Sequence, residues 1–309
     1  MDGLQRAGVG DLIARLDYLV HNAALGQQRH DETKINQGRI LTELYRARGG
    51  RRLSDFEFKV FSQWGEDGII QRLIAEVPIA HRTFIEFGVE DFMESNCRYL
   101  LMNDNWQGMV LDGSAANIER LRTSYFFWKH DLRAEAQFIT AENIDHLLGR
   151  AGFDVDLGLL SVDVDGMDFW ILESIRCVRP RILVTEYNAL FGPERIVTVP
   201  YEADFQRTRK HHSNLYYGAS LGAMTALAIA RGYDLVGTNS TGSNAFFVRS
   251  DVRPHSLPAL SVAEAYTPCR IREARDAGGR LTFASREEQE AIIRGLPVYN
   301  VATGELEPF

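Results

Sequence analysis

The chain has 309 residues, of which 45% are hydrophobic and 25% are charged. This composition is ordinary for a globular protein with one large domain, with or without an appendage. The net charge of −8 argues against a broad nucleic-acid-binding surface, which would need clustered Lys and Arg. No segment approaches the roughly 18 consecutive apolar residues of a membrane span.

Residues 1–20 contain acidic side chains and lack the apolar core and cleavage site of a signal peptide. The three cysteines, Cys97, Cys177 and Cys269, are odd in number and far apart in the sequence. They are typical of reduced thiols rather than of a disulfide framework or a zinc site. We therefore expect a cytoplasmic protein.

Residues 1–50 form a predicted helical arm. Apolar residues recur there at helical spacing in two groups, Leu12, Ile13, Leu16 and Leu19, and then Ile35, Ile40, Leu41 and Leu44. A polar stretch separates the groups, which predicts two helices or one interrupted helix. The apolar stripe must pack somewhere, either in a homo-oligomer formed through the arm or on the protein's own core.

Residues 51–252 alternate between predicted strands and helices. The strands are expected at 83–89, 108–112, 136–140, 157–163, 181–187, 233–238 and 244–250, and the helices at 64–77, 93–104, 114–126, 141–152, 168–177 and 221–231. The last two strands are joined by NSTGS, too short for a parallel crossover, so they must form an antiparallel hairpin. A mostly parallel, seven-stranded Rossmann-like sheet ending in such a hairpin is the architecture of class I methyltransferases. Residues 253–309 are expected to form a helical extension packed on this domain.

Ligands of open α/β sheets collect at the carboxyl ends of the strands, so the residues there are the candidate site. The first strand ends in Glu86-Phe87-Gly88, and the G-x-G-x-x-G phosphate cradle is missing from the sequence. The second strand ends in Asp112, which can accept both hydroxyls of a ribose, or can favour the positive end of the following helix. Ser114 is placed to cap that helix beside the cofactor. Asp131 either approaches an adenine or lies in a solvated loop.

Three segments together resemble the FkbM-type methyltransferases: FSQWGEDGIIQRLI, TFIEFGVEDFMESNCRYLLMNDNWQGMVLDGS and LSVDVDGMDFWILESI. The resemblance spans roughly residues 60–250, with departures at Val89, at Cys97 and in the Asp163-x-Asp165-Gly166-x-Asp168 motif. It implies S-adenosylmethionine as methyl donor and an oxygen acceptor, commonly on a sugar or glycan. It also implies a cofactor pocket formed by Gln63, Glu86, Gly88, Asn96 and Asp112.

Oxygen-bearing side chains follow the fourth and fifth predicted strands. Asp163 and Asp165 follow the fourth strand, and Glu186 and Asn188 lie at the end of the fifth. Such ligands suit Mg²⁺, Mn²⁺ or Ca²⁺. Alternatively, these residues cap helices and bind the amino group of the donor.

Methylation of a hydroxyl requires removal of its proton. His212 is the first candidate for the general base, because it lies in a polar segment where an acceptor would enter and titrates near neutrality. Asp163 and a metal-activated hydroxyl are the other two candidates. A surface position for the His211-His212 pair is an equally good interpretation.

Three rival functions remain. SVDVDGMD resembles the nucleophile motif of haloacid dehalogenase-like phosphatases, but Met167 replaces the usual Thr and no matching Lys and Gly-Asp-Asp segment follows. Asp163-Val164-Asp165 satisfies the D-x-D pattern of metal-dependent glycosyltransferases, although the preceding residues suit an adenosyl site better. A non-catalytic assembly protein is the third rival, against which the intact acidic strand ends argue.

Overall fold

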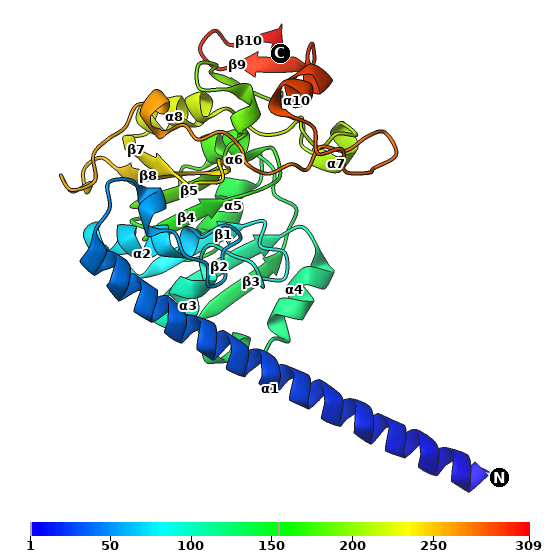
Figure 1. The fold of residues 1–309 in the computed structure, drawn as a ribbon. Helices are drawn as coiled ribbons and strands as arrows, with labels where there is room; N and C mark the ends of the chain where they lie inside the picture. The colour runs from blue at the N-terminus through cyan, green and yellow to red at the C-terminus, as the bar shows by residue number, and fades with distance from the viewer. Residues whose placement is uncertain (1, 154) are drawn as a thin grey trace.

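The computed structural model describes residues 2–153 and 155–309, with side chains from Gly10 onward. Its centre is a seven-stranded Rossmann-like sheet in the order β3-β2-β1-β4-β5-β8-β7 (Figure 1). The strands are β1 Thr83–Phe87, β2 Gln107–Asp112, β3 Leu132–Ala136, β4 Leu159–Val162, β5 Ile182–Glu186, β7 Tyr233–Thr238 and β8 Asn244–Arg249. Neighbouring strands are parallel except that β8 runs antiparallel to both β5 and β7. The expected mostly parallel sheet with a terminal hairpin is therefore confirmed.

Helices cover both faces of this sheet. One face carries α2 Glu66–Glu76, α3 Arg98–Asp104 and α4 Ala115–Arg122, whereas the other carries α5 Ile144–Gly149, α6 Asp168–Ser174 and α8 Leu221–Ala230. The central strand β4 is buried along its whole length, as a parallel strand covered on both faces must be. The two faces hold separate apolar cores, so the sheet is a rigid platform whose strand ends position the loops.

Strand β3 begins four residues before the position predicted from the sequence. It is the edge strand, in which Leu132 and Ala134 are buried while Arg133 between them is exposed. The more apolar residues 136–140, where the strand was expected, mostly form the loop at its carboxyl end. An edge strand can bury one face alone, so polar residues alternate with apolar ones along it. This alternation made the strand less apolar than the loop after it, and its position was therefore predicted wrongly.

The N-terminal arm is one continuous helix, α1 Asp2–Arg48, rather than two helices or an interrupted one. The polar stretch stays helical because Gln27 bonds Asp31 and Gln28 bonds Glu32 across one turn. Asp31 is also fully buried against the domain, where it pairs with Arg98 at 2.5 Å. The second half of α1 therefore packs on the domain, and the first half projects away from it (Figure 1).

The C-terminal residues contain strands as well as the expected helices. Helices α9 Val262–Ala265 and α10 Arg286–Ile293 are short, and β9 Pro297–Asn300 forms a hairpin with β10 Glu305–Pro308. The hairpin turns at Gly304, whose φ of 76° favours glycine, and β9 pairs with β6 Val197–Thr198. The purely helical extension was therefore a wrong expectation, because the two strands are too short to show a clear alternation.

The remaining helices are short connectors: α7 Arg207–Lys210 and the 3-10 turns η1 Leu53–Phe56, η2 Phe127–Lys129 and η3 Ala189–Phe191. None of the helices in the described residues combines the length and apolar character needed to span a bilayer.

Candidate functional site

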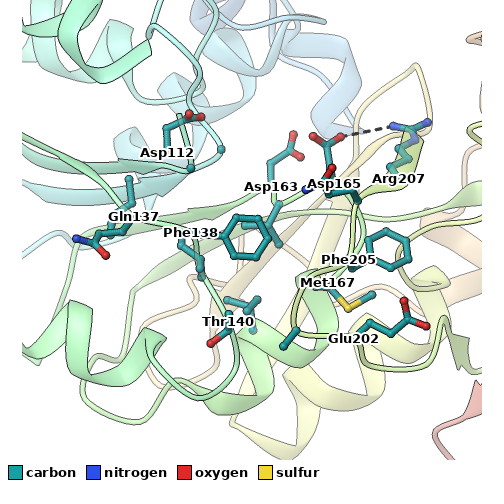
Figure 2. Close-up of a pocket in the computed structure, with 18 of the residues that line it drawn as sticks. Asp112, Gln137, Phe138, Thr140, Asp163, Asp165, Met167, Glu202, Phe205 and Arg207 are labelled. Atoms are coloured by element: carbon teal, nitrogen blue, oxygen red, sulfur yellow. Dashed lines mark ion pairs between the residues drawn. The ribbon is translucent and has the colours of Figure 1, made fainter. Parts of the chain in front are cut away.

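Two adjoining hollows lie at the carboxyl edge of the sheet. The first, of about 310 Å³, opens between the ends of β2, β3 and β4 (Figure 2), and the second, of about 300 Å³, between the ends of β1, β4 and β5. Both are lined by Gly88, Asp112, Asp163, Asp165 and Arg207, so they form one continuous depression. This is the edge of an open α/β sheet where ligands bind.

Asp112, at the tip of β2, stands where the two hollows meet. Its carboxylate accepts hydrogen bonds from the backbone N–H groups of Glu90 and Ser114, each at 2.8 Å. Only 8% of the residue is exposed. Each carboxylate oxygen has more than one lone pair, so Asp112 can still accept hydrogen bonds from a ligand. The two backbone bonds hold its side chain in one orientation towards that ligand.

Side chains that the sequence analysis missed line the first hollow. Gln137, Phe138 and Thr140 follow β3, and Met167 and Phe205 face them across the hollow (Figure 2). Phe138 is 48% exposed, which is unusual for a phenylalanine and leaves its ring available to a planar ligand. Gln137, Phe138 and Thr140 were missed because the third strand was predicted over residues 136–140, of which 137–140 form a loop at the rim of the hollow.

Gly88 makes the bend after β1 and has a φ of 67°. A Cβ atom at this position would stand 1.8 Å from the carbonyl oxygen of Asp163. Glycine is therefore required by the protein's own backbone, in addition to any ligand that approaches the bend.

Glu86 is a buried carboxylate that organises the loop beyond the bend. It accepts hydrogen bonds from the Ser95 hydroxyl at 2.5 Å, from the Asn96 N–H at 2.7 Å and from the Cys97 N–H at 3.1 Å. Burial raises the pKa of Glu86 to about 7, against its usual 4.5. Glu86 thus serves the second hollow mainly by placing Asn96, and the exposed Gln63 completes the same wall.

Three carboxylates gather between the ends of β4 and β5: those of Asp163, Asp168 and Glu186. One oxygen from each lies within 4.8 Å of the others. Burial and the neighbouring carboxylates raise the pKa of Asp163 and that of Glu186 well above their usual values. Burial raises the pKa of Asp168 to about 6. Among the described residues, the Oε2 atom of Glu186 is buried without a hydrogen-bond partner.

Arg207 is the cation beside this cluster. Its guanidinium lies 3.5 Å from the centre of the Tyr217 ring, forms an ion pair with Glu273, and donates from Nε to the Asn214 carbonyl at 2.9 Å. The positive charge of Arg207 opposes the rise in the pKa of Asp163 and of Glu186. The cluster is therefore partly neutralised, and one carboxylate oxygen remains without a protein partner.

The predicted metal set was Asp163, Asp165, Glu186 and Asn188, and the structure corrects two of its members. The Asp165 side chain is 77% exposed and faces Arg207 at 3.8 Å, because the backbone turns at this residue with a φ of 54° (Figure 2). Asn188 is buried, and its amide bonds the Leu215 and Tyr217 carbonyls and the Leu190 N–H. Asp168, at the start of α6, takes the place in the cluster expected for Asp165.

Three further predicted residues lie outside both hollows. His212 is exposed and stacks on His211 with ring centres 4.3 Å apart, so the structure does not place it as the base. Asp131 lies at the amino end of β3, where its carbonyl accepts from Gly108 N–H, on the edge of the sheet opposite the site. Ser114 caps α4, as expected, by accepting from the Asn117 N–H, and reaches the site only through its bond to Asp112.

No protein-family model and no curated protein matches this sequence. Solved structures with a similar fold include the N-terminal domain of EvdMO1 with SAH bound, at 10% identity over 59% of this chain and 79% of that one, with a TM-score of 0.40. An O-methyltransferase from Bacillus cereus in complex with SAH matches at 10% identity over 70% and 89%, with a TM-score of 0.38. An O-methyltransferase family protein from Burkholderia thailandensis matches at 10% identity over 59% and 57%, with a TM-score of 0.36. Similarities this low establish neither a family nor an activity for this chain.

Proposed function

We propose that this chain is an S-adenosylmethionine-dependent O-methyltransferase. The observation that carries the proposal is the position of Asp112, oriented at the tip of β2 between a glycine bend and an apolar wall with Phe138. A carboxylate there can accept both ribose hydroxyls, and the Phe138 ring can lie against an adenine. The sequence has no glycine-rich phosphate cradle, which fits a donor that carries no phosphate.

The reaction would place the methionine part of the donor along the wall with Gln63, Glu86 and Asn96, which the resemblance gives to the cofactor. It assigns the part of the second hollow beside Asp163 and Glu186 to the acceptor. The methyl group would leave the sulfonium sulfur of the donor as the acceptor oxygen attacks from the opposite side, and the sulfur keeps the bonding electron pair. The acceptor's hydroxyl proton then needs a base. Asp163 lies in this hollow, and its raised pKa makes its ionised form a stronger base than an ordinary carboxylate. Asp163 thus replaces His212 as the proposed base.

A divalent cation, Mg²⁺ or Mn²⁺, fits the same cluster, with Asp163, Asp168 and Glu186 as the ligands. Their oxygens converge, their raised pKa values record mutual repulsion and burial, and Glu186 has a buried oxygen without a protein partner. A bound cation would lower the pKa of an acceptor hydroxyl and so ease the loss of its proton. Asp163 would then be a ligand, so the metal-assisted and metal-free schemes are alternatives for the same residue.

The acceptor class rests on the sequence resemblance to FkbM-type methyltransferases, whose acceptors are commonly sugar or glycan hydroxyls. Segments that carry it converge in the structure: Asn96 and Gln63 line the second hollow, and Asp168 joins the carboxylate cluster. Asp67 of the SQWGED segment is buried and binds three backbone N–H groups at residues 60–62. That segment therefore shapes the wall bearing Gln63.

We further propose that the protein forms a homodimer through α1. The projecting half of the helix exposes Leu12, Ile13, Leu16, Leu19 and Val20, each between 52% and 68% exposed. Leu12, Leu16 and Leu19 recur at intervals of four and three residues, which is the heptad spacing of a coiled-coil seam. A second copy of the same helix presents a matching stripe.

Calorimetric titration of the purified protein with S-adenosylhomocysteine, UDP and a phosphate mimic tests the proposed function. We expect saturable binding of S-adenosylhomocysteine, with no requirement for a divalent cation and no displacement of S-adenosylhomocysteine by UDP. Preferential binding of UDP would instead favour a D-x-D glycosyltransferase, and binding of the phosphate mimic alone would favour a phosphatase.

A further inference from the structure

A third hollow, of about 380 Å³, lies beside the site. Its charged lining residues are basic, whereas those of the carboxylate cluster are acidic. It is formed by η3, by residues 269–272 and by the start of α10. Three arginines line it, Arg270, Arg272 and Arg286, and none of its described lining residues is acidic. We call it the arginine pocket. In a chain with a net charge of −8, three arginines that line one cavity indicate an anionic occupant.

The protein itself neutralises little of this charge. Arg286 pairs with one carboxylate, donating from Nε to Glu290 at 2.9 Å. Arg270 and Arg272 are exposed, and neither forms an ion pair within 4.0 Å in the part of the chain that the structure describes. Arg270 acts on one carboxylate at longer range, because its charge opposes the rise in the pKa of Glu57. The start of α10 is already closed by a capping box between Ser285 and Glu288. The affinity of the pocket for an anion therefore rests on the arginines.

The arginine pocket adjoins the proposed acceptor hollow. Cys269 and Ile271 line both cavities, so the segment at 269–272 is a shared wall. Ala189 and Leu190, on the other side of the pocket, follow Glu186 of the carboxylate cluster by three and four residues. An acceptor with its anionic group in the arginine pocket would have to pass the segment at 269–272 to reach the carboxylate cluster.

We propose that the arginine pocket binds a phosphate ester of the acceptor, so that the substrate class is a phosphorylated sugar or sugar nucleotide. A phosphate monoester carries a charge of about −1.5 to −2 at neutral pH and offers three oxygens, which three arginines match better than they match a single carboxylate. The planar guanidinium can bind two phosphate oxygens at once. This inference rests on the proposed function, because it assigns the neighbouring hollow to the acceptor.

Calorimetry with inorganic pyrophosphate tests the pocket, using the 309-residue chain saturated with S-adenosylhomocysteine at low ionic strength. We expect pyrophosphate to bind, and the double variant Arg270→Gln/Arg272→Gln to bind it at least tenfold more weakly. The matched control is Arg280→Gln/Arg294→Gln, which removes the same charge from exposed positions outside the pocket and should keep the affinity within about twofold of native. No pyrophosphate binding, or equal loss in both variants, overturns the proposal.

Competition distinguishes the source of the phosphate. Sugar phosphates and sugar nucleotides that displace pyrophosphate from the native protein, but bind poorly to the pocket variant, identify an esterified phosphate. If inorganic phosphate competes and no ester does, the pocket takes free phosphate and the acceptor assignment is wrong. Affinity for S-adenosylhomocysteine, measured separately in both variants, should be unchanged, so failure of the cofactor site and failure of the pocket are seen independently.

Discussion

The carbonyl oxygen of Asp163 lies against Gly88 so closely that a Cβ on residue 88 would stand 1.8 Å from it. This contact joins the bend after β1 to the end of β4. Both hollows are lined by these two residues, and Asp112 stands beside them at the tip of β2. The spacing of the strand tips, and with it the shape of the whole site, depends on a residue without a side chain.

Gly88→Ala should therefore destabilise the protein and distort the site. The variant must adopt a left-handed backbone and also move the Asp163 carbonyl, at a cost of at least about 2 kcal/mol in the free energy of unfolding. Chemical denaturation measures this loss. Gly149→Ala is the matched control, since an added Cβ there meets nothing within 4 Å. Equal stability of the two variants would show that the contact is not constraining.

The carboxylate cluster should bind a divalent cation through Asp163 and Glu186 and not through Asp165. Asp163→Asn or Glu186→Gln should weaken Mn²⁺ binding, measured by calorimetry, by at least about tenfold, because each removes a charged ligand. Asp165→Asn is the control, because its side chain is 77% exposed and points to Arg207. Chelation should then lower methyl transfer in the native protein. Unchanged Mn²⁺ affinity in Glu186→Gln would remove the metal from the scheme.

The buried Glu86 should make stability depend on pH. Its pKa is about 7 in the folded protein, against 4.5 for the exposed group, so the folded state holds a proton that the unfolded state has released between these values. The contribution of Glu86 to the free energy of unfolding is therefore complete below about pH 4.5, and it is lost as the pH rises to about 7. The effect is about 1.4 kcal/mol for each unit by which the pKa is raised.

Glu86→Gln isolates this effect, because the cost of its altered hydrogen bonds does not vary with pH. We expect the variant to gain stability relative to the native protein as the pH is raised from 4.5 to 7, as measured by denaturation at each pH. Glu119→Gln, on the exposed face of α4, should show no such trend. A constant difference between the native protein and Glu86→Gln would mean that Glu86 titrates normally.

Charges placed on the projecting half of α1 should abolish dimerisation. Leu16→Asp/Leu19→Asp puts two carboxylates in the apolar stripe, where pairing would bury them. Light scattering should report a monomer for this variant and a dimer for the native chain. Ile40→Asp/Leu44→Asp is the control, as both residues are 56–67% exposed on the half that packs on the domain. A monomeric native protein would contradict the proposed role of α1.

Much of the fold could be predicted because its signals are local. The apolar run at 157–163 predicted the central strand. The short link between residues 238 and 244 predicted the antiparallel hairpin. Strand β3 could not be placed, because Leu132 and Ala134 supply its only buried side chains, and the stronger apolar pattern lay in the following loop. That shift also hid Phe138 from the candidate site.

That Gly88 and Asp112 line the hollows could be predicted from the sequence, because ligands of such a sheet collect at the carboxyl ends of its strands. The carboxylates that converge could be predicted only in part, because side-chain direction depends on backbone turns. Asp165 points outward owing to its positive φ, and Asp168 replaces it from the first turn of α6. Asn188 has the right chemistry, but its hydrogen bonds to the Leu215 and Tyr217 carbonyls are visible only once the loop at 215–217 is in place.

The measurement that tests the central claim most directly is the affinity of Asp112→Asn for S-adenosylhomocysteine. Loss of the carboxylate charge that accepts hydrogen bonds from the ribose hydroxyls should weaken binding at least tenfold, which corresponds to about 1.4 kcal/mol. Asp131→Asn, at the opposite edge of the sheet, should bind like the native protein. Native-like affinity in Asp112→Asn, with its fold intact by circular dichroism, would contradict the account, as would a native protein that does not bind the ligand.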